Sequence, residues 1–199
     1  SLGVTSVQDM GPDPDDVAIY EAFASRGELT ARIRAVPAEV PLAARLASGP
    51  VRHHPSAFLH VTGAKGFADG SLGSTTAFFF EPYTDDPASR GLLADEMQPL
   101  EGMRTRLVAI DKAGEQLCIH AIGDRAISMV LDLFEDVQRA NGPRDRRPRI
   151  EHSQHLAPKD FARYAQLGAI ASVQPYHAID DGKWAEKRIG AGRAKTTYA

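Results

Sequence analysis

The sequence predicts an α/β protein in which parallel strands alternate with helices, arranged as a partial (β/α)8 barrel. The first observation is the alternation itself, because about six short apolar strands are separated by helical stretches. An open doubly wound sheet would show the same alternation, but its Rossmann version would carry a Gly-x-Gly-x-x-Gly motif directly after the first strand, and that motif is absent there. The second observation is that polar residues lie at or just after several predicted strands. Barrel enzymes gather their active-site residues at such carboxyl ends, so the barrel is favoured.

Composition excludes several classes of protein. The chain has 199 residues, with 23 Lys and Arg against 26 Asp and Glu, which gives a formal net charge of −3. A 43% hydrophobic share is ordinary for a globular domain, and the near-neutral charge argues against a nucleic-acid partner. The apolar stretches fall short of the ~18–20 residues that cross a bilayer, and the start at Ser1-Leu2, which resembles a cloning remnant, has no signal-peptide pattern. We therefore expect a single domain over residues 1–199, and the lone Cys118 fits a reducing, cytoplasmic compartment.

The first half of the chain contains three predicted strands. They cover residues 3–8, 29–36 and 58–64. A helix is predicted over about residues 15–25, with Asp13 as N-cap and Gly27 as the stop. A shorter helix is predicted over residues 41–48.

The second half has clearer helix signals. Apolar residues recur with helical spacing over residues 124–141, and Gly142-Pro143 ends that pattern. Further helices are predicted over residues 100–113 and 158–167, and strands over residues 116–119, 149–150 and 169–173.

His120 and His152 are the strongest candidate metal ligands. Each follows a predicted strand that precedes a helix, and the two strands belong to successive βα units. Neutral imidazole is a common ligand for Zn²⁺, and two histidines at neighbouring strand ends can converge on one ion. A single histidine in such a place is more often a structural hydrogen-bonding group, but the recurrence favours the metal.

Three other residues are candidates for the same site. Lys65 ends the third predicted strand between Ala64 and Gly66, where it could be a partly desolvated, reactive lysine or a solvated surface residue. Asp69 could orient a ligand at the site or simply form the turn before Gly70. His177 follows the last strand and could touch a substrate. Asp69 and His177 are the two residues that we predict to bind substrate.

Five segments, taken in order, resemble the amidohydrolase superfamily, and more narrowly its YtcJ-like branch, amidohydrolase family 3. The resemblance extends over nearly the whole chain, and the segments are residues 3–9 (GVTSVQD), 65–74 (KGFADGSLGS), 120–126 (HAIGDRA), 149–154 (RIEHSQ) and 171–175 (ASVQP).

The resemblance implies a deformed (β/α)8 barrel with one or two divalent metals, usually zinc, at the carboxyl ends of the strands. The metal activates water for attack on an amide-type carbon. By position, Lys65 would be the strand-four lysine, carboxylated by CO₂ to a carbamate that bridges two metals, and His120 and His152 would be the ligands from strands five and six.

Three features depart from the family pattern. No His-x-His pair, which the family carries on its first barrel strand, occurs in this sequence, and the aspartate that acts as general base on the eighth strand would follow Ala199. Thr75 stands where the family often has arginine. The chain is thus similar to strands two to seven of a longer enzyme. No residue of this chain is identified as the catalytic general base, and we expect the 199-residue chain alone to be inactive.

Three functions remain open at this point. The leading one is a fragment of a metal-dependent amidohydrolase that hydrolyses non-peptide C–N bonds of a small-molecule substrate. The second is an inactive remnant that serves as a structural or binding module, with self-association as a homo-oligomer covering its open sheet edges. The third is a metal-independent enzyme in which Lys65 forms a Schiff base.

Overall fold

The computed structural model describes residues 3–38 and 52–198, and its α/β chain divides into two compact units. The first unit comprises Ser1–Gly66 and Ala109–Cys118, and the second comprises Phe67–Val108 and Ile119–Ala199. The helix predicted over residues 41–48 lies outside the described residues. No helix in the described ranges is long and apolar enough to span a membrane.

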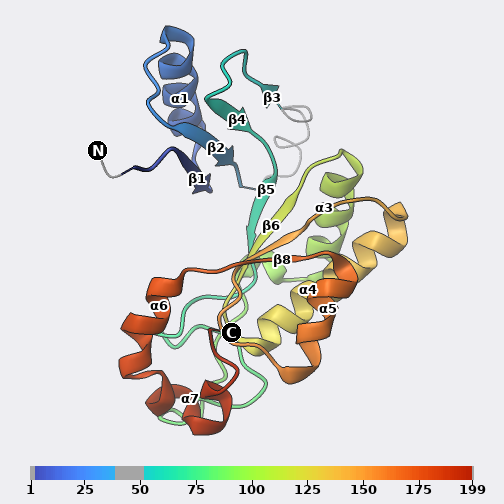
Figure 1. Ribbon diagram of the computed structural model, residues 1–199. Coiled ribbons are helices and arrows are strands. Elements are labelled where there is room, and N and C mark those ends of the chain that lie inside the picture. The colour runs from blue at the N-terminus through green and yellow to red at the C-terminus, as the bar shows by residue number, and fades with distance from the viewer. Residues whose placement is uncertain (1–2, 39–51, 199) are drawn as a thin grey trace. The chain divides into compact units, whose positions relative to one another are not determined.

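The first unit contains a four-stranded sheet in the order β1-β2-β4-β3 (Figure 1). Strands β1 (Ser6–Met10), β2 (Arg32–Val36) and β4 (Leu59–Val61) are parallel, and β3 (Arg52–His53) is antiparallel to β4. The core of this sheet is apolar. Its buried members are Ala24, Ala35, Leu59 and Val61, and Val17, Tyr20, Leu29 and Ile33 pack against them.

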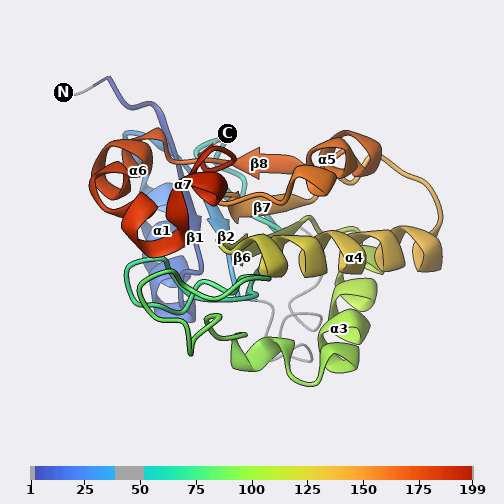
Figure 2. The ribbon, with the colours of Figure 1, turned by 90° about the horizontal axis from the view of Figure 1, so that it is seen from below.

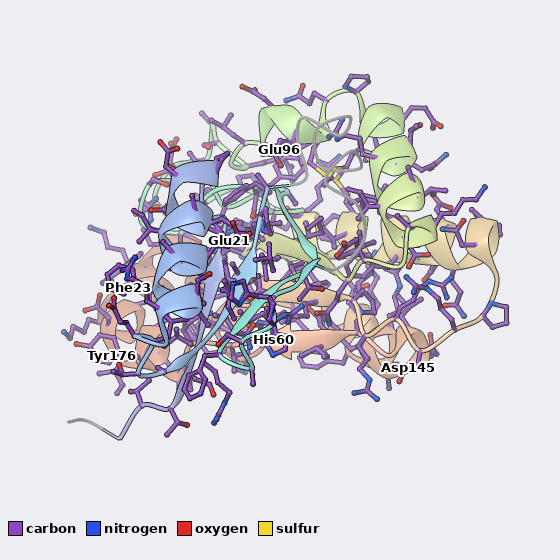
Figure 3. All side chains as sticks on the ribbon, turned by 90° about the horizontal axis from the view of Figure 1, so that it is seen from above. Glu21, Phe23, His60, Glu96, Asp145 and Tyr176 are labelled. Carbon is purple, nitrogen blue, oxygen red and sulfur yellow. The ribbon has the colours of Figure 1, made fainter. Side chains whose placement is uncertain are left out.

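Helix α1 (Pro14–Arg26) confirms the start and stop signals in the sequence. The Asp13 side chain accepts hydrogen bonds from the backbone N–H groups of Asp15 and Asp16, which satisfies donors that have no partner within the helix. Gly27 ends the helix in the left-handed conformation. Figure 3 labels Glu21 and Phe23 on this helix, where the Phe23 side chain is 42% exposed.

A second sheet has the order β5-β6-β7-β8. Its strands are β5 (Ala64–Phe67), β6 (Leu117–Ala121), β7 (Arg149–His152) and β8 (Ile170–Ser172), and β7 pairs in parallel with β8. The chain is therefore α/β with parallel sheets.

The single strand predicted over residues 58–64 is wrong, because two strands occupy this region. Gly63 has a φ of +82°, a left-handed conformation that interrupts an extended chain, so that β4 ends before it and β5 begins after it. A Cβ at this position would lie 3.0 Å from the Gln116 carbonyl oxygen. The close approach explains why glycine occupies the break.

The second unit contains the most regular helix, α4 (Asp124–Asn141), with the predicted bounds. The predicted apolar face of α4 is buried, and its members are Ile127, Val130, Leu131, Phe134 and Val137. Figure 2 shows α4 and α5 (Phe161–Leu167) together beside β7 and β8. The Arg163 guanidinium of α5 donates to Asp132 and Glu135 of α4, which joins the two helices.

Other helices differ from the expected pattern in length or presence. Helix α3 covers Leu100–Lys112, close to prediction, and the predicted helix over residues 158–167 is a 3₁₀ turn followed by α5. Helices α6 (Pro175–Asp180) and α7 (Ala185–Ala194) were not predicted. Both are short, and α7 contains Gly190 in a non-helical conformation, so neither leaves a clear helical pattern.

Helix α7 packs on the glycine-rich segment that follows Phe67. The buried cluster here comprises Leu72, Ala77, Phe79, Tyr83, Ile122, Ala185 and Ile189, with Trp184 packed against it. Arg188 places its guanidinium over the Tyr83 ring and donates to the Thr75 hydroxyl and the Leu72 carbonyl. An arginine of α7 therefore contacts the loop that contains Leu72 and Thr75.

Candidate functional site

Lys65 is buried within β5 of the first unit, with 4% of its surface exposed. Its backbone N–H donates to the Pro37 carbonyl, and Nζ donates to the Gly66 carbonyl at 2.9 Å. A solvated surface lysine is therefore wrong as an interpretation. The functional role of Lys65 stays a prediction.

His120 lies inside β6, one residue before the strand ends at Ala121. Its Nε2 atom is 2.9 Å from the Gly70 carbonyl oxygen, and 3.5 Å from the Asp69 carboxylate. Because a carbonyl oxygen accepts hydrogen bonds and cannot donate them, Nε2 carries the hydrogen in this contact. In the neutral ring the lone pair is then on Nδ1.

His152 is the last residue of β7 and has the opposite tautomer. Its Nδ1 lies 2.7 Å from Oε1 of Gln174. The Gln174 amide is oriented by its NH₂ group, which donates to the Ser172 carbonyl at 3.2 Å, so its oxygen faces the imidazole. His152 therefore donates from Nδ1, and the lone pair of the neutral ring is on Nε2.

Three of the four histidines in the second unit, His120, His152 and His177, lie next to one another. The ring centroids of His120 and His152 are 4.6 Å apart with their planes at 69°, and those of His152 and His177 are 5.8 Å apart with their planes at 9°. These residues come from β6, β7 and α6, so the predicted site residues of this unit meet in space. Tyr176, labelled in Figure 3, is in contrast 71% exposed.

Asp69 is buried and holds two loops in place. One carboxylate oxygen accepts the backbone N–H of Ile122, and the other accepts those of Gly123 and Phe78, at 2.8–3.0 Å. The carboxylate thus lies at the N-terminus of α4, where negative charge is stabilised. Asp69 thus does more than form the turn before Gly70, because its carboxylate joins two loops. The expected contact between Asp69 and substrate stays a prediction.

The segment after Asp69 supplies the hydrogen-bond acceptor for His120. A Cβ on Gly70 would lie 1.9 Å from the Thr76 hydroxyl oxygen, so the backbone fits here only with glycine. The Gly70 N–H donates to the Thr76 carbonyl, and Thr75 adopts a φ of +62°. This tight turn fixes the carbonyl that sets the tautomer of His120.

Sequence reasoning missed several residues that support His152. His152 and Ser153 both have positive φ, which is strained for residues with a side chain. The Ser153 hydroxyl donates to the Ile150 carbonyl and contacts the Tyr164 hydroxyl at 2.8 Å. Gln174 left a weak signal as a polar residue after a strand, but Tyr164 left none.

The donor set of this site fits a divalent metal in part. Two neutral imidazoles with fixed tautomers offer the nitrogen lone pairs that Zn²⁺ prefers. Within residues 3–38 and 52–198, no group of three or more His, Cys, Asp or Glu side chains is placed to hold an ion. The second unit therefore offers two candidate ligands, whereas a catalytic zinc usually has three from the protein.

Comparisons with known proteins match this chain along its length. The model of the amidohydrolase family matches residues 1–199. The Arabidopsis thaliana protein LONG AFTER FAR-RED 3 is 50% identical over 144 residues, which is 72% of this chain and 24% of that protein. The Bacillus subtilis protein named Putative amidohydrolase YtcJ is 36% identical over 133 residues, or 67% of this chain and 24% of its own length.

Two solved structures share the fold. An uncharacterized metal-dependent hydrolase from Pyrococcus horikoshii has a TM-score of 0.86 and 31% identity, and one from Pyrococcus furiosus has a TM-score of 0.86 and 29% identity. The alignments cover 99% of this chain but 38% and 40% of those chains. This chain thus spans about a quarter of the curated relatives and about two fifths of the solved ones. It belongs to the amidohydrolase family, in the YtcJ-like branch known as family 3.

Proposed function

We propose that this chain forms part of the active centre of a metal-dependent hydrolase that cleaves non-peptide C–N bonds, with His120 and His152 as ligands of a divalent ion, most simply Zn²⁺. The observation that carries the proposal is the pair of imidazoles 4.6 Å apart, each held in one tautomer by an acceptor on its other nitrogen. Such hydrogen bonds to the second nitrogen are typical of histidines that ligate metals. A divalent ion at this place would supply Lewis acidity towards a carbonyl group.

Lys65 is the proposed further ligand, as a carbamate formed with CO₂. Its burial in β5 and its place in the motif of residues 65–74 support this role. A carbamate converts a cationic side chain into an anionic oxygen donor, which suits a site for one or two divalent ions. In this proposal the strands correspond to strands two to seven of a (β/α)8 barrel, in agreement with the likeness to the metal-dependent hydrolases.

In this proposal the remaining residues of the site either orient the two imidazoles or contact the substrate. The Gly70 carbonyl and Gln174 hold the two imidazoles, and Asp69 fixes the loops on which Gly70 and Gly123 lie. We propose a small-molecule substrate, for which Asp69 and His177 are the candidate contacts. We also propose that this protein self-associates as a homo-oligomer and that it is located in the cytoplasm.

The second candidate function, an inactive structural or binding module, is favoured by one observation. The described residues contain two well-placed histidines but no group of three metal-binding side chains. A chain that ligates an ion through two residues alone would bind it weakly.

The test is the metal content of the purified 199-residue protein, measured by elemental mass spectrometry beside an intact mass. We expect zinc in near-stoichiometric amount, its loss in His152→Asn, and its retention in the control variant His60→Asn, whose imidazole is exposed in the first unit. A labile mass increase of one CO₂, absent in Lys65→Arg, would support the carbamate. Equal zinc content in the wild type, His152→Asn and His60→Asn would contradict the role of His152. A metal-free protein that assembles stably would favour the inactive module.

A further inference from the structure

A buried glutamine behind His177 forms the centre of a hydrogen-bond network. Gln154 is 3% exposed, and its Nε2 donates to the Asp181 carboxylate at 2.8 Å and to the Tyr198 hydroxyl oxygen at 2.9 Å. The Tyr198 hydroxyl in turn donates to Asp181 at 2.7 Å. All of these residues belong to the second unit.

The network fixes the orientation of the Gln154 amide. A carboxylate accepts hydrogen bonds and cannot donate them, so the reversed amide would place two oxygen acceptors in contact at the Asp181 position. The hydroxyl hydrogen of Tyr198 is directed at Asp181, so Tyr198 also accepts from Gln154. An unsatisfied buried polar contact of this kind is costly, and the amide oxygen of Gln154 therefore faces away from Asp181.

That amide oxygen lies 3.4 Å from Nδ1 of His177, a long and therefore weak hydrogen bond that favours one tautomer of the ring. Because Oε1 accepts, Nδ1 carries the hydrogen, and the lone pair of neutral His177 is on Nε2, on the other side of the ring. The ring is stacked on His152 at 5.8 Å, beside the proposed metal ligands. Gln174 orients His152 in the same way, because its amide oxygen also accepts a hydrogen bond from Nδ1 of the ring.

We infer that His177 is a specificity-determining residue that accepts a hydrogen bond from a substrate N–H through Nε2, and that Gln154 and Asp181 are its positioning residues. The inference rests on the proposed hydrolysis of C–N bonds and narrows its substrates to compounds with an N–H group, such as primary or secondary amides and ureides. A fully N-alkylated amide has no hydrogen to donate, so it would leave Nε2 of the half-buried His177 without this contact and should bind less well than an amide with an N–H.

The tautomer can be read directly from long-range ¹H–¹⁵N NMR spectra of the metal-free protein with labelled histidine, at a pH well above the ordinary histidine pKa of ~6.5. We expect His177 to carry its hydrogen on Nδ1. In Asp181→Asn the new amide can donate to Gln154 Oε1, so the Gln154 amide can turn and the resonances of His177 should shift towards the other tautomer. The matched control is Asp180→Asn, a neighbouring and exposed residue whose replacement should leave these resonances unchanged.

Two results would overturn the inference. One is a wild-type protein in which His177 carries its hydrogen on Nε2, and this reading does not depend on the folding of any variant. The other concerns titration with acetamide and with N,N-dimethylacetamide, which lacks an N–H. We expect acetamide alone to shift the His177 Nε2 resonance, and equal shifts, or none, would contradict the proposed contact. Neither measurement requires metal or turnover, so its outcome is separate from that of the proposed hydrolase function.

Discussion

The two units of this chain differ in what their polar side chains do. In the first unit, Glu115 accepts the backbone N–H of Gly63 at 2.6 Å, and Lys65 donates to the carbonyl beside it, so these groups satisfy nearby backbone. In the second unit, Gln154 and Gln174 each orient a histidine through an amide that is itself fixed by a further acceptor. The hydrogen bonds of Glu115 and Lys65 therefore stabilise the local backbone, whereas those of Gln154 and Gln174 favour one position for the hydrogen of a histidine ring.

The largest effect is expected where one side chain holds several backbone groups. Asp69→Ala would leave the N–H groups of Phe78, Ile122 and Gly123 without their acceptor. Each unpaired buried donor costs about 1–3 kcal/mol, so we expect a loss of about 3–5 kcal/mol in the free energy of unfolding, measured with urea. The control Asp145→Ala removes an exposed carboxylate, labelled in Figure 3, and should cost less than about 0.5 kcal/mol. Equal losses in the two variants would contradict the role of Asp69.

The second prediction concerns pH and His155. Burial, aided by the charge of Arg193, lowers the pKa of His155 to about 3. The unfolded chain, with an ordinary pKa of ~6.5, takes up a proton that the folded chain does not, so stability falls as the pH decreases from about 6.5 towards 3, by ~1.4 kcal/mol per pH unit at most.

Urea unfolding at several pH values checks this dependence. His155→Gln should show a shallower loss than the wild type over that range, and His60→Gln, with an exposed imidazole, should match the wild type. The same slope in all three proteins would assign the acid sensitivity to other groups.

The third prediction addresses Gln174, which fixes the tautomer of His152. In Gln174→Leu the Nδ1 hydrogen loses its acceptor, and we expect zinc affinity to fall by about 10-fold to 100-fold. Gln138→Leu, an exposed change on α4, is the control. Competition with a zinc indicator would measure the zinc affinity of both variants, and an unchanged affinity in Gln174→Leu would show that Gln174 does not support zinc binding by His152.

The smallest effect is expected at Tyr164. Burial raises the pKa of Tyr164 to about 12, so the hydroxyl stays protonated and contacts Ser153 at 2.8 Å. Tyr164→Phe removes this contact beside the strained turn at His152, and we expect a loss of about 1 kcal/mol in stability. A stability equal to wild type would show that the turn is held by other contacts.

Local signals explain how much of the fold could be predicted. The bounds of α4 follow from its apolar spacing and from Gly142, and those of α1 from Asp13 and Gly27. The break between β4 and β5 could not be predicted, because a single glycine within the strand-like stretch of residues 58–64 does not by itself indicate a left-handed conformation.

The candidate site could be predicted in its residues but not in its geometry. His120, His152 and His177 are each predicted from a place after the end of a predicted strand, and their rings lie next to one another in the structure. Asp69 accepts from Ile122 and Gly123, more than fifty residues away, and no local pattern encodes such a contact. The same holds for Gln154, which contacts Asp181 and Tyr198 from a distant part of the chain.

The most direct test of the central claim is a zinc titration of the histidine-labelled protein, followed by the ¹⁵N resonances of the ring nitrogens. We expect zinc to shift the resonances of His120 Nδ1 and His152 Nε2, the two atoms that carry the lone pairs, while His120 Nε2 and His152 Nδ1 keep their hydrogens. Zinc that shifts neither histidine, or that displaces the hydrogens on His120 Nε2 and His152 Nδ1, would contradict it.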